Sequence, residues 1–246
     1  MNKLSIILEQ YNGKLSAQIL NPQDDYQIHT DHWVSFDWSE RIISLESQGQ
    51  DFQGLLCRAI QGRKKQAPRP VIDASAGLGG DALYLAYHGH RVLAFERDEV
   101  VFKLLSDAKK RALDQFGEKH WISAIELIDG DFPEKMTAEM LREWSDAVVY
   151  YDPMYAQGGR DQKKRRTKKE MQFLREYFSL KNQGVESKAS EKDDRFELIE
   201  KSLKLGIGTF VIKGPRKSKP LELAQINHNG GLEGKTTRYD RYLAKI

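Results

Sequence analysis

Short apolar runs alternate with amphipathic segments along most of the chain, beginning at Val71. The apolar runs have the length of buried strands, and the segments between them carry apolar residues at helical spacing. The expected strands lie at 71–73, 91–95, 124–128 and 147–151. The expected helices between them lie near 79–88, 98–113 and 134–143. This succession predicts a parallel sheet covered by helices on both faces, with right-handed crossovers.

The same pattern continues to the end of the chain. The further elements expected are a helix at 52–60, helices near 167–179 and 193–205, and strands at 209–213 and near 237–244. A polar, proline-containing connector separates the first of these helices from Val71. We therefore expect residues 49–246 to form a Rossmann-like α/β domain with a mostly parallel sheet.

The first 48 residues have a different pattern, in which apolar and polar positions alternate over short stretches. These stretches are Lys3–Leu8, Lys14–Ile19 and Trp33–Phe36. Asn12-Gly13 separates the first two, and this dipeptide between alternating runs indicates a hairpin. We expect residues 1–48 to form a small β-rich N-terminal subdomain.

A glycine-rich segment, Asp73–Asp81, follows the first strand of the expected sheet and leads directly into a helix. Its glycines Gly77 and Gly79 can adopt positive φ and let a ligand approach the backbone closely. The N–H groups in the first turn of the helix are free to bind polar groups of a ligand. The segment predicts a site for a nucleotide-like cofactor, although a tight strand-to-helix turn without a ligand would have a similar pattern.

The residues of the turn favour S-adenosylmethionine (SAM) over a nicotinamide dinucleotide. No third glycine follows Gly79 by three residues, as the dinucleotide fingerprint requires. Asp73 ends its strand at the edge where open α/β sheets bind ligands. A carboxylate there would repel a pyrophosphate but would accept a hydrogen bond from the ammonium group of SAM.

Acidic residues also follow the second and third strands of the sheet. Glu96 has two oxygens that match the vicinal hydroxyls of a ribose, so we expect it to bind the ribose of the cofactor. Asp131 is a candidate partner for the adenine amino group, and Phe132 a candidate cover for the adenine ring. Both residues would also suit a simple turn before Pro133.

The fourth strand ends in Asp152-Pro153-Met154-Tyr155, which is similar to the [D/N]-P-P-[Y/F] signature of methyltransferases that act on nucleobase amines. The lone pair of an exocyclic amine is delocalised into the ring, which makes the amine a poor nucleophile. The Asp152 carboxylate and the Pro153 carbonyl would accept the amine protons and align the nitrogen with the methyl group. Tyr155 would stack on the extruded base. These three residues are the expected catalytic set.

A basic block follows this segment directly. Its expected RNA-binding residues are Lys163, Lys164, Arg165, Arg166, Lys168 and Lys169. The net charge of the whole chain is only +3, which does not by itself argue for a polyanionic partner. A solvated charged loop would explain the block equally well, but its position after Asp152 favours nucleic acid.

Cysteine, apolar and histidine residues indicate which compartment and which cofactors to expect. Cys57 is the only cysteine, so we expect no disulfide and a reducing, cytoplasmic environment. No window approaches the roughly 20 apolar residues of a membrane span. The histidines show no metal-ligand spacing, and we expect no metal; His88 and His90 are expected to be turn or surface residues. Methyl transfer from a sulfonium needs no metal.

Taken together, these segments resemble the 16S rRNA guanine-N2 methyltransferases of the RsmJ type, which are class I SAM-dependent enzymes. The resemblance runs from about Gly54 to the C-terminus. The most specific segments are 73–81, 95–97, 149–155, 168–171, 211–215 and 238–240. Two departures are Ile43–Gln53, which is rich in Ser, Glu and Gln where the family often has a basic, glycine-rich segment, and Ala156, where a proline is common.

The resemblance implies methyl transfer from SAM to N2 of one guanosine in 16S rRNA, the family target being guanine-1516. The cofactor contacts that it implies are Gly80, Asp81, Glu96, Arg97, Asp131, Phe132 and Asp152, and Lys213 joins the expected RNA-binding residues. Three alternatives stay open: methylation of another base amine such as adenine N6, a non-catalytic RNA-binding assembly factor, and, more remotely, a nicotinamide-dependent oxidoreductase.

Overall fold

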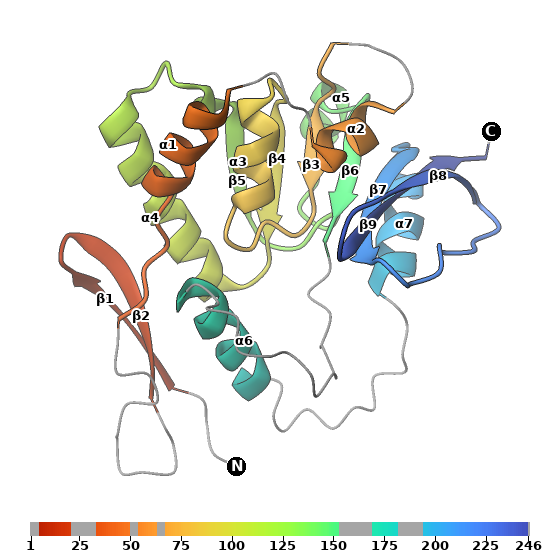
Figure 1. Ribbon diagram of the computed structural model, residues 1–246. Helices are drawn as coiled ribbons and strands as arrows, with labels where there is room; N and C mark the ends of the chain where they lie inside the picture. Colours follow the sequence, from red (N-terminus) through yellow and green to blue (C-terminus); the bar gives the residue numbers. More distant parts are fainter. Residues whose placement is uncertain are drawn as a thin grey trace.

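The computed structural model describes residues 5–20, 33–49, 54–62, 67–152, 169–181 and 194–245. Its centre is a seven-stranded sheet with the order β5-β4-β3-β6-β7-β9-β8 (Figure 1). The strands are β3 (Val71–Asp73), β4 (Val92–Glu96), β5 (Ile125–Asp129), β6 (Val148–Tyr151), β7 (Thr209–Pro215), β8 (Ile226–Glu233) and β9 (Thr237–Ala244). The first five run parallel, and β9 pairs antiparallel with both β7 and β8. The expected mostly parallel α/β sheet is confirmed.

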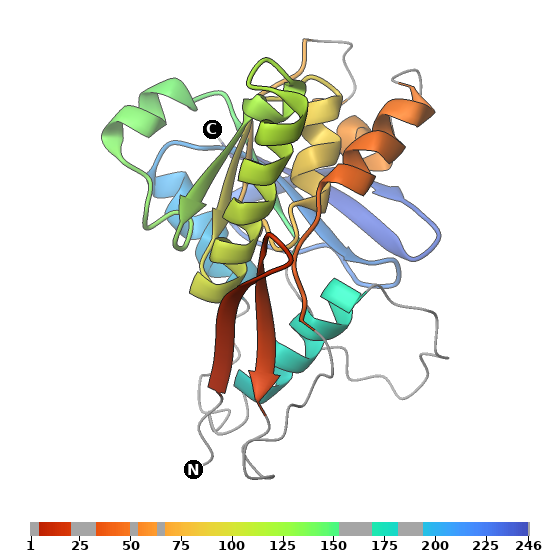
Figure 2. The same cartoon turned by 90° about the vertical axis from the view of Figure 1, so that its left-hand side faces the viewer.

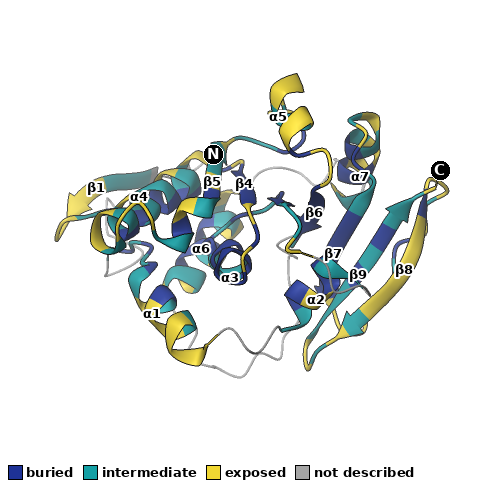
Figure 3. Ribbon diagram, turned by 90° about the horizontal axis from the view of Figure 1, so that it is seen from above, coloured by how far each residue is buried: buried dark blue, intermediate teal, exposed yellow. Residues whose placement is uncertain are grey.

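Helices cover both faces of this sheet (Figure 3). The helices are α1 (Ser39–Gln48), α2 (Leu55–Gln61), α3 (Gly80–Tyr87), α4 (Glu99–Phe116), α5 (Ala138–Glu143), α6 (Lys169–Lys181), α7 (Asp194–Lys204) and the 3-10 helix η1 (Trp121–Ala124). None of these helices is long and apolar enough to cross a membrane; the search covered the described ranges alone.

Strand alternation divides the interior into two hydrophobic clusters. In β3, Val71 contributes to one cluster and Ile72 to the other, because successive side chains of a strand point to opposite faces. The Val71 cluster also contains apolar residues from α1, α2, α3, α4 and α6. The Ile72 cluster contains Leu198 and Ile199 of α7, with Met140 of α5 packed against it. The continuous apolar runs of the sequence thus correspond to strands buried on both sides.

The N-terminal hairpin is present as predicted. Strands β1 (Ser5–Tyr11) and β2 (Lys14–Leu20) pair antiparallel around Asn12 and Gly13, whose φ angles are 51° and 72°. Positive φ at both positions is the requirement of a type I′ turn. The hairpin lies beside α4 (Figure 2), where the Leu15 N–H donates to Asp107 over 3.2 Å.

Three elements were not predicted, and one of them is the short 3-10 helix η1. Helix α1 lies inside the segment expected to be β-rich, and its residue Ile42 is fully buried in the cluster that α3 and α4 share. Strand β8 was missed because its sequence is polar and contains Gly230 and Gly231, and it lies at the edge of the sheet with a bulge. The domain boundary at residue 48 stays a prediction.

Asp98, which follows β4, links the start of α4 to α6. Its carboxylate caps α4 by accepting the N–H groups of Val100 and Val101, both over 3.0 Å. It also accepts the Tyr177 hydroxyl over 2.8 Å and the Lys181 ammonium over 2.5 Å. Asp98 is only 3% exposed, so α6 is held to the start of α4 by a buried polar cluster.

Substituting Asp98→Ala is expected to lower the free energy of unfolding by about 2–4 kcal/mol, because it removes a helix cap and leaves the buried Tyr177 hydroxyl without its acceptor. Urea denaturation would measure this loss. Asp114→Ala is the matched control, since Asp114 is an exposed residue of the same helix whose one ion-pair partner among the described residues is Lys110. Its effect should stay within about 0.5 kcal/mol. Equal effects of the two variants would contradict the structural role given to Asp98.

Candidate active site

Three of the predicted site residues, Asp73, Glu96 and Asp152, lie where parallel strands of the sheet end. Asp73 ends β3, Glu96 ends β4, and Asp152 follows β6 directly. Lys213 lies near the end of β7, the neighbour of β6. Parallel strands bring their carboxyl ends to one edge, so residues far apart in the sequence share one site.

The glycine turn between β3 and α3 has the predicted backbone conformation. Gly77 and Gly79 have φ angles of 53° and 72°, in the left-handed region that favours glycine. A Cβ at Gly79 would lie 2.5 Å from the Trp38 ring and 2.9 Å from Leu105. A Cβ at Gly77 would meet nothing closer than the Ser75 carbonyl at 3.9 Å. Gly79 is therefore required by packing, whereas Gly77 borders open space.

Glu96 holds the glycine turn against the end of β4. One carboxylate oxygen accepts the Gly77 N–H over 2.8 Å, and the other accepts the Asp98 N–H over 2.9 Å. Each oxygen keeps a second lone pair for a further donor. Burial raises the pKa of this carboxyl above its usual value. These bonds fix the orientation that a ribose diol would need.

Asp73 lies beneath the turn and is 1% exposed. Its carboxylate accepts the Ser75 N–H over 3.1 Å. Burial raises the pKa of Asp73 to about 8, and the negative charges of Asp81, Asp152 and Glu96 add to that shift. The edge of the sheet is consequently an acidic environment that a positively charged ligand would stabilise.

Asp152, Lys213 and Asp81 form a chain of charges at this edge. The Lys213 ammonium donates to Asp152 over 2.7 Å and to Asp81 over 3.0 Å. Asp81, in the first turn of α3, also accepts the hydroxyl of Tyr150 over 2.5 Å. Burial opposes the charge of Lys213, but the two carboxylates outweigh it and raise the pKa of its ammonium. The network connects β6, β7 and α3.

Asp152 is held from both its backbone and its side chain. Its N–H donates to the Ser75 hydroxyl over 2.8 Å, which connects the end of β6 to the glycine turn. Burial raises the pKa of its carboxyl, and the Lys213 ammonium opposes that shift. Lys213 takes only the oxygen Oδ2, and no described residue bonds Oδ1. Asp152 therefore keeps one carboxylate oxygen available to an amine donor.

The third segment expected to bind the cofactor is Asp131-Phe132, after β5. The Phe132 ring is 3% exposed and packs against Phe95, with ring centroids 5.2 Å apart. Burial raises the pKa of Asp131, while the nearby charge of Arg97 lowers it. Arg97 is exposed and lies 4.0 Å from Asp194. The cofactor contacts assigned to these residues stay predictions.

Several predicted site residues lie outside the described ranges. They are Pro153, Tyr155, Lys163, Lys164, Arg165, Arg166 and Lys168. Lys169 is described and is an exposed residue at the start of α6. The ammonium of Lys213, which is predicted to contact RNA, lies between the carboxylates of Asp81 and Asp152, and the RNA contact stays a prediction.

Ser75 and Tyr150 were given no role from the sequence, although both lie within the segments 73–81 and 149–155, because their contacts join residues that are far apart in the chain. His88 and His90, expected to be turn or surface residues, lie in the turn after α3, where both are buried. They are 8% and 0% exposed, and His90 contacts the Arg69 carbonyl over 2.8 Å. Within the described ranges, no three His, Cys, Asp or Glu side chains gather into a metal site.

The raised pKa of Asp73 predicts how the stability of the unliganded protein depends on pH. Between the ordinary pKa of 3.8 and about 8, the folded protein keeps a proton that the unfolded chain releases. The contribution of Asp73 to stability therefore falls as pH rises through this window, by up to about 1.4 kcal/mol per pH unit.

Asp73→Asn would remove this contribution and keep an acceptor for the Ser75 N–H. The gain in unfolding free energy of the variant over the wild type should therefore grow between pH 5 and pH 8, as measured by urea denaturation. Asp114→Asn, at an exposed position, serves as the control. A difference that does not change with pH would show that Asp73 is ionised throughout.

Comparison with known proteins identifies the family. Residues 2–244 match the family described as "Putative SAM-dependent methyltransferase". Proteins named ribosomal RNA small subunit methyltransferase J are 32% identical to the chain: that of Pseudomonas fluorescens aligns with 99% of this chain and 88% of its own length, and that of Legionella pneumophila with 95% and 82%. A solved SAM-dependent methyltransferase from Neisseria gonorrhoeae superposes with a TM-score of 0.66 at 25% identity, covering 98% of this chain and 84% of that one. The cofactor and family expected from the sequence are thereby confirmed, and the chain belongs to the family of SAM-dependent methyltransferases.

Proposed function

We propose that this protein transfers a methyl group from SAM to N2 of a guanosine in 16S rRNA, at the position corresponding to the family target, guanine-1516. The proposal rests on two supports: the carboxylate arrangement at the end of β6, and relatives whose names specify the small-subunit ribosomal RNA. Such a substrate places the enzyme in the cytoplasm.

The described residues fit SAM as a ligand. Glu96 offers an acceptor on each oxygen to a ribose diol, and it is already oriented by Gly77 and Asp98. The buried Asp73 and the neighbouring carboxylates suit the positive charges of SAM, whose sulfonium supplies an activated methyl group. Gly77 adds no side chain between the turn and a ligand.

The single observation that carries the reaction type is the fixed carboxylate of Asp152. Its backbone is tied to Ser75, and its Oδ2 is held by Lys213. The ammonium of Lys213 favours the ionised form of the carboxyl, so Oδ1 can accept a hydrogen bond from an exocyclic amine. That bond would orient the nitrogen lone pair toward the methyl group and stabilise the positive charge that develops on nitrogen.

Transfer of tritiated methyl groups tests the substrate. The expected acceptor is 16S rRNA, naked or within the small subunit, from cells that lack this enzyme; digestion should release N2-methylguanosine. RNA already methylated by the enzyme is the control. Label in adenine N6 would support the alternative amine. Binding of RNA without any transfer would support an assembly factor.

Asp152→Asn is expected to lower kcat by at least about 100-fold, because the amide cannot offer a charged acceptor. The affinity for SAM, measured by calorimetry, should change little. Asp152→Ala should abolish transfer. Asp129→Asn is a control at the exposed end of β5, which three strands separate from β7, the strand of Lys213. Activity near the wild-type level in Asp152→Asn would exclude the amine-orienting role.

The basic block gives a separate prediction. Replacing Lys163, Lys164, Arg165 and Arg166 with Gln should weaken RNA binding and flatten its dependence on salt, because each lost phosphate contact removes released counterions. Filter binding at several salt concentrations measures the slope. An unchanged slope would mean that this block is a solvated charged segment.

A further inference from the structure

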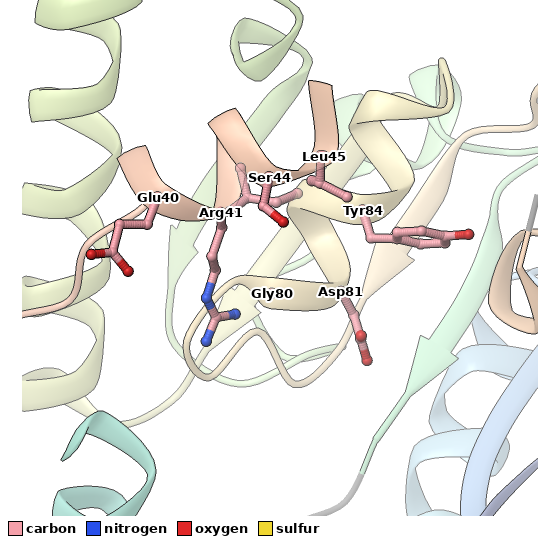
Figure 4. A pocket seen from close by; sticks show the side chains of 8 residues that line it. Glu40, Arg41, Ser44, Leu45, Gly80, Asp81 and Tyr84 are labelled. Atoms are coloured by element: carbon pink, nitrogen blue, oxygen red, sulfur yellow. The ribbon is translucent and has the colours of Figure 1, made fainter. Parts of the chain in front are cut away.

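A hollow of about 610 Å³ lies between α1 and α3, directly beside the catalytic edge (Figure 4). Arg41 and Ser44 of α1 line one side, and Gly80, Asp81 and Tyr84 of α3 line the other. Ser44 is an exposed residue, so the hollow is open to solvent. Asp81 belongs both to this hollow and to the network that holds Asp152. The hollow therefore adjoins the place where we expect the target amine.

The cation of this hollow is Arg41. Figure 4 shows its guanidinium reaching from α1 toward the glycine turn beside Gly80. The two are so close that a Cβ at Gly80 would collide with Arg41 Nη1. In the part of the chain that the structure describes, no hydrogen bond or ion pair engages this guanidinium. Arg41 thus presents its donors to the hollow.

The position of Arg41 is fixed by its neighbours rather than by its own contacts. Trp38, at the start of α1, is 1% exposed and donates its indole N–H to the Leu78 carbonyl over 3.1 Å. Ile42, next to Arg41, is fully buried. These two anchors attach the first turn of α1 to the glycine turn. The guanidinium is consequently carried by a rigid element.

A cation at this place offsets the negative charge of the neighbouring carboxylates. The carboxylates of Asp81, Glu96 and Asp152 make this edge of the sheet acidic, which suits SAM but repels the phosphates of a nucleic acid. Lys213 does not offset these charges for an incoming phosphate, because its ammonium lies between Asp81 and Asp152. The guanidinium has the planar set of donors that binds a phosphate in bidentate fashion.

We propose that Arg41 binds a backbone phosphate of the RNA next to the target guanosine and so positions that nucleotide over the catalytic edge. This inference rests on the proposed function, since it takes RNA as the substrate. The other candidate ligand for this guanidinium is the carboxylate of the methionine part of SAM, because Gly80 and Asp81, which line the hollow, are also expected cofactor contacts.

The test compares Arg41→Ala and Arg41→Lys with the wild type, and uses Arg142→Ala as the matched control. Arg142 is an exposed arginine on α5, which covers the opposite face of the sheet (Figure 3). For Arg41→Ala we expect the KM for 16S rRNA to rise about tenfold. The slope of log affinity against log salt should fall by about one. The affinity for SAM should stay within about twofold. Arg41→Lys should recover part of the loss, and Arg142→Ala should match the wild type.

Each other result overturns the inference in a recognisable way. Weaker SAM binding in Arg41→Ala, with an unchanged salt slope, would assign the guanidinium to the cofactor carboxylate. Wild-type KM and slope in that variant would remove Arg41 from the site while leaving the proposed function intact. If the wild type itself neither binds nor methylates small-subunit RNA, the proposed function fails and this inference fails with it.

Discussion

At the edge of the sheet where β3, β4 and β6 end, several carboxylates are buried close together. The structure of this edge depends on the few groups that offset their charge. Burial alone favours the neutral forms of Asp73, Glu96 and Asp152. Backbone N–H groups stabilise Glu96, and the Lys213 ammonium stabilises Asp152. Among the described residues, Asp73 has no cationic partner and only the Ser75 N–H as a donor, and its pKa rises furthest of the three. The edge is thus electrostatically incomplete without a positive ligand, and this is the property that a cofactor with a sulfonium and an ammonium group can use.

Strands β3, β4 and β6 could be predicted from the sequence because they are buried on both faces. Runs such as Val148–Tyr151 contain no charged residue, and amphipathic segments separate these runs from one another. The same reasoning failed for elements whose stability comes from tertiary contact. Helix α1 has a mixed sequence and is held mainly by Trp38 and Ile42, which reach into a core made by distant residues. Strand β8 is held by its pairing with β9. Five consecutive residues of this eight-residue strand are exposed, so its sequence lacks an apolar pattern.

The site could be predicted as far as local sequence determines which side chains end the strands. Asp73, Glu96 and Asp152 are all found where a parallel sheet must bring them. The interactions between them could not be predicted. Lys213 and Asp81 are 132 positions apart, and their contact exists only because β7 lies beside β6 in the strand order. The burial of His90 could not be predicted either, because a polar residue beside a turn is usually exposed. Here the His90 N–H donates to the Leu85 carbonyl and its ring contacts the Arg69 carbonyl, which keeps the residue in the core.

The glycine turn connects the strand ends with the N-terminal segment, because its residues contact different neighbours. Gly77 donates to Glu96, Ser75 accepts the N–H of Asp152, and Leu78 accepts the indole of Trp38. Gly79 has room for no side chain beside Trp38, so the N-terminal segment and the turn are packed as one unit. A segment without any motif of its own is thereby placed next to the carboxylates at the edge of the sheet. Its contribution is geometric: it carries the Arg41 guanidinium into a hollow that Asp81 also lines.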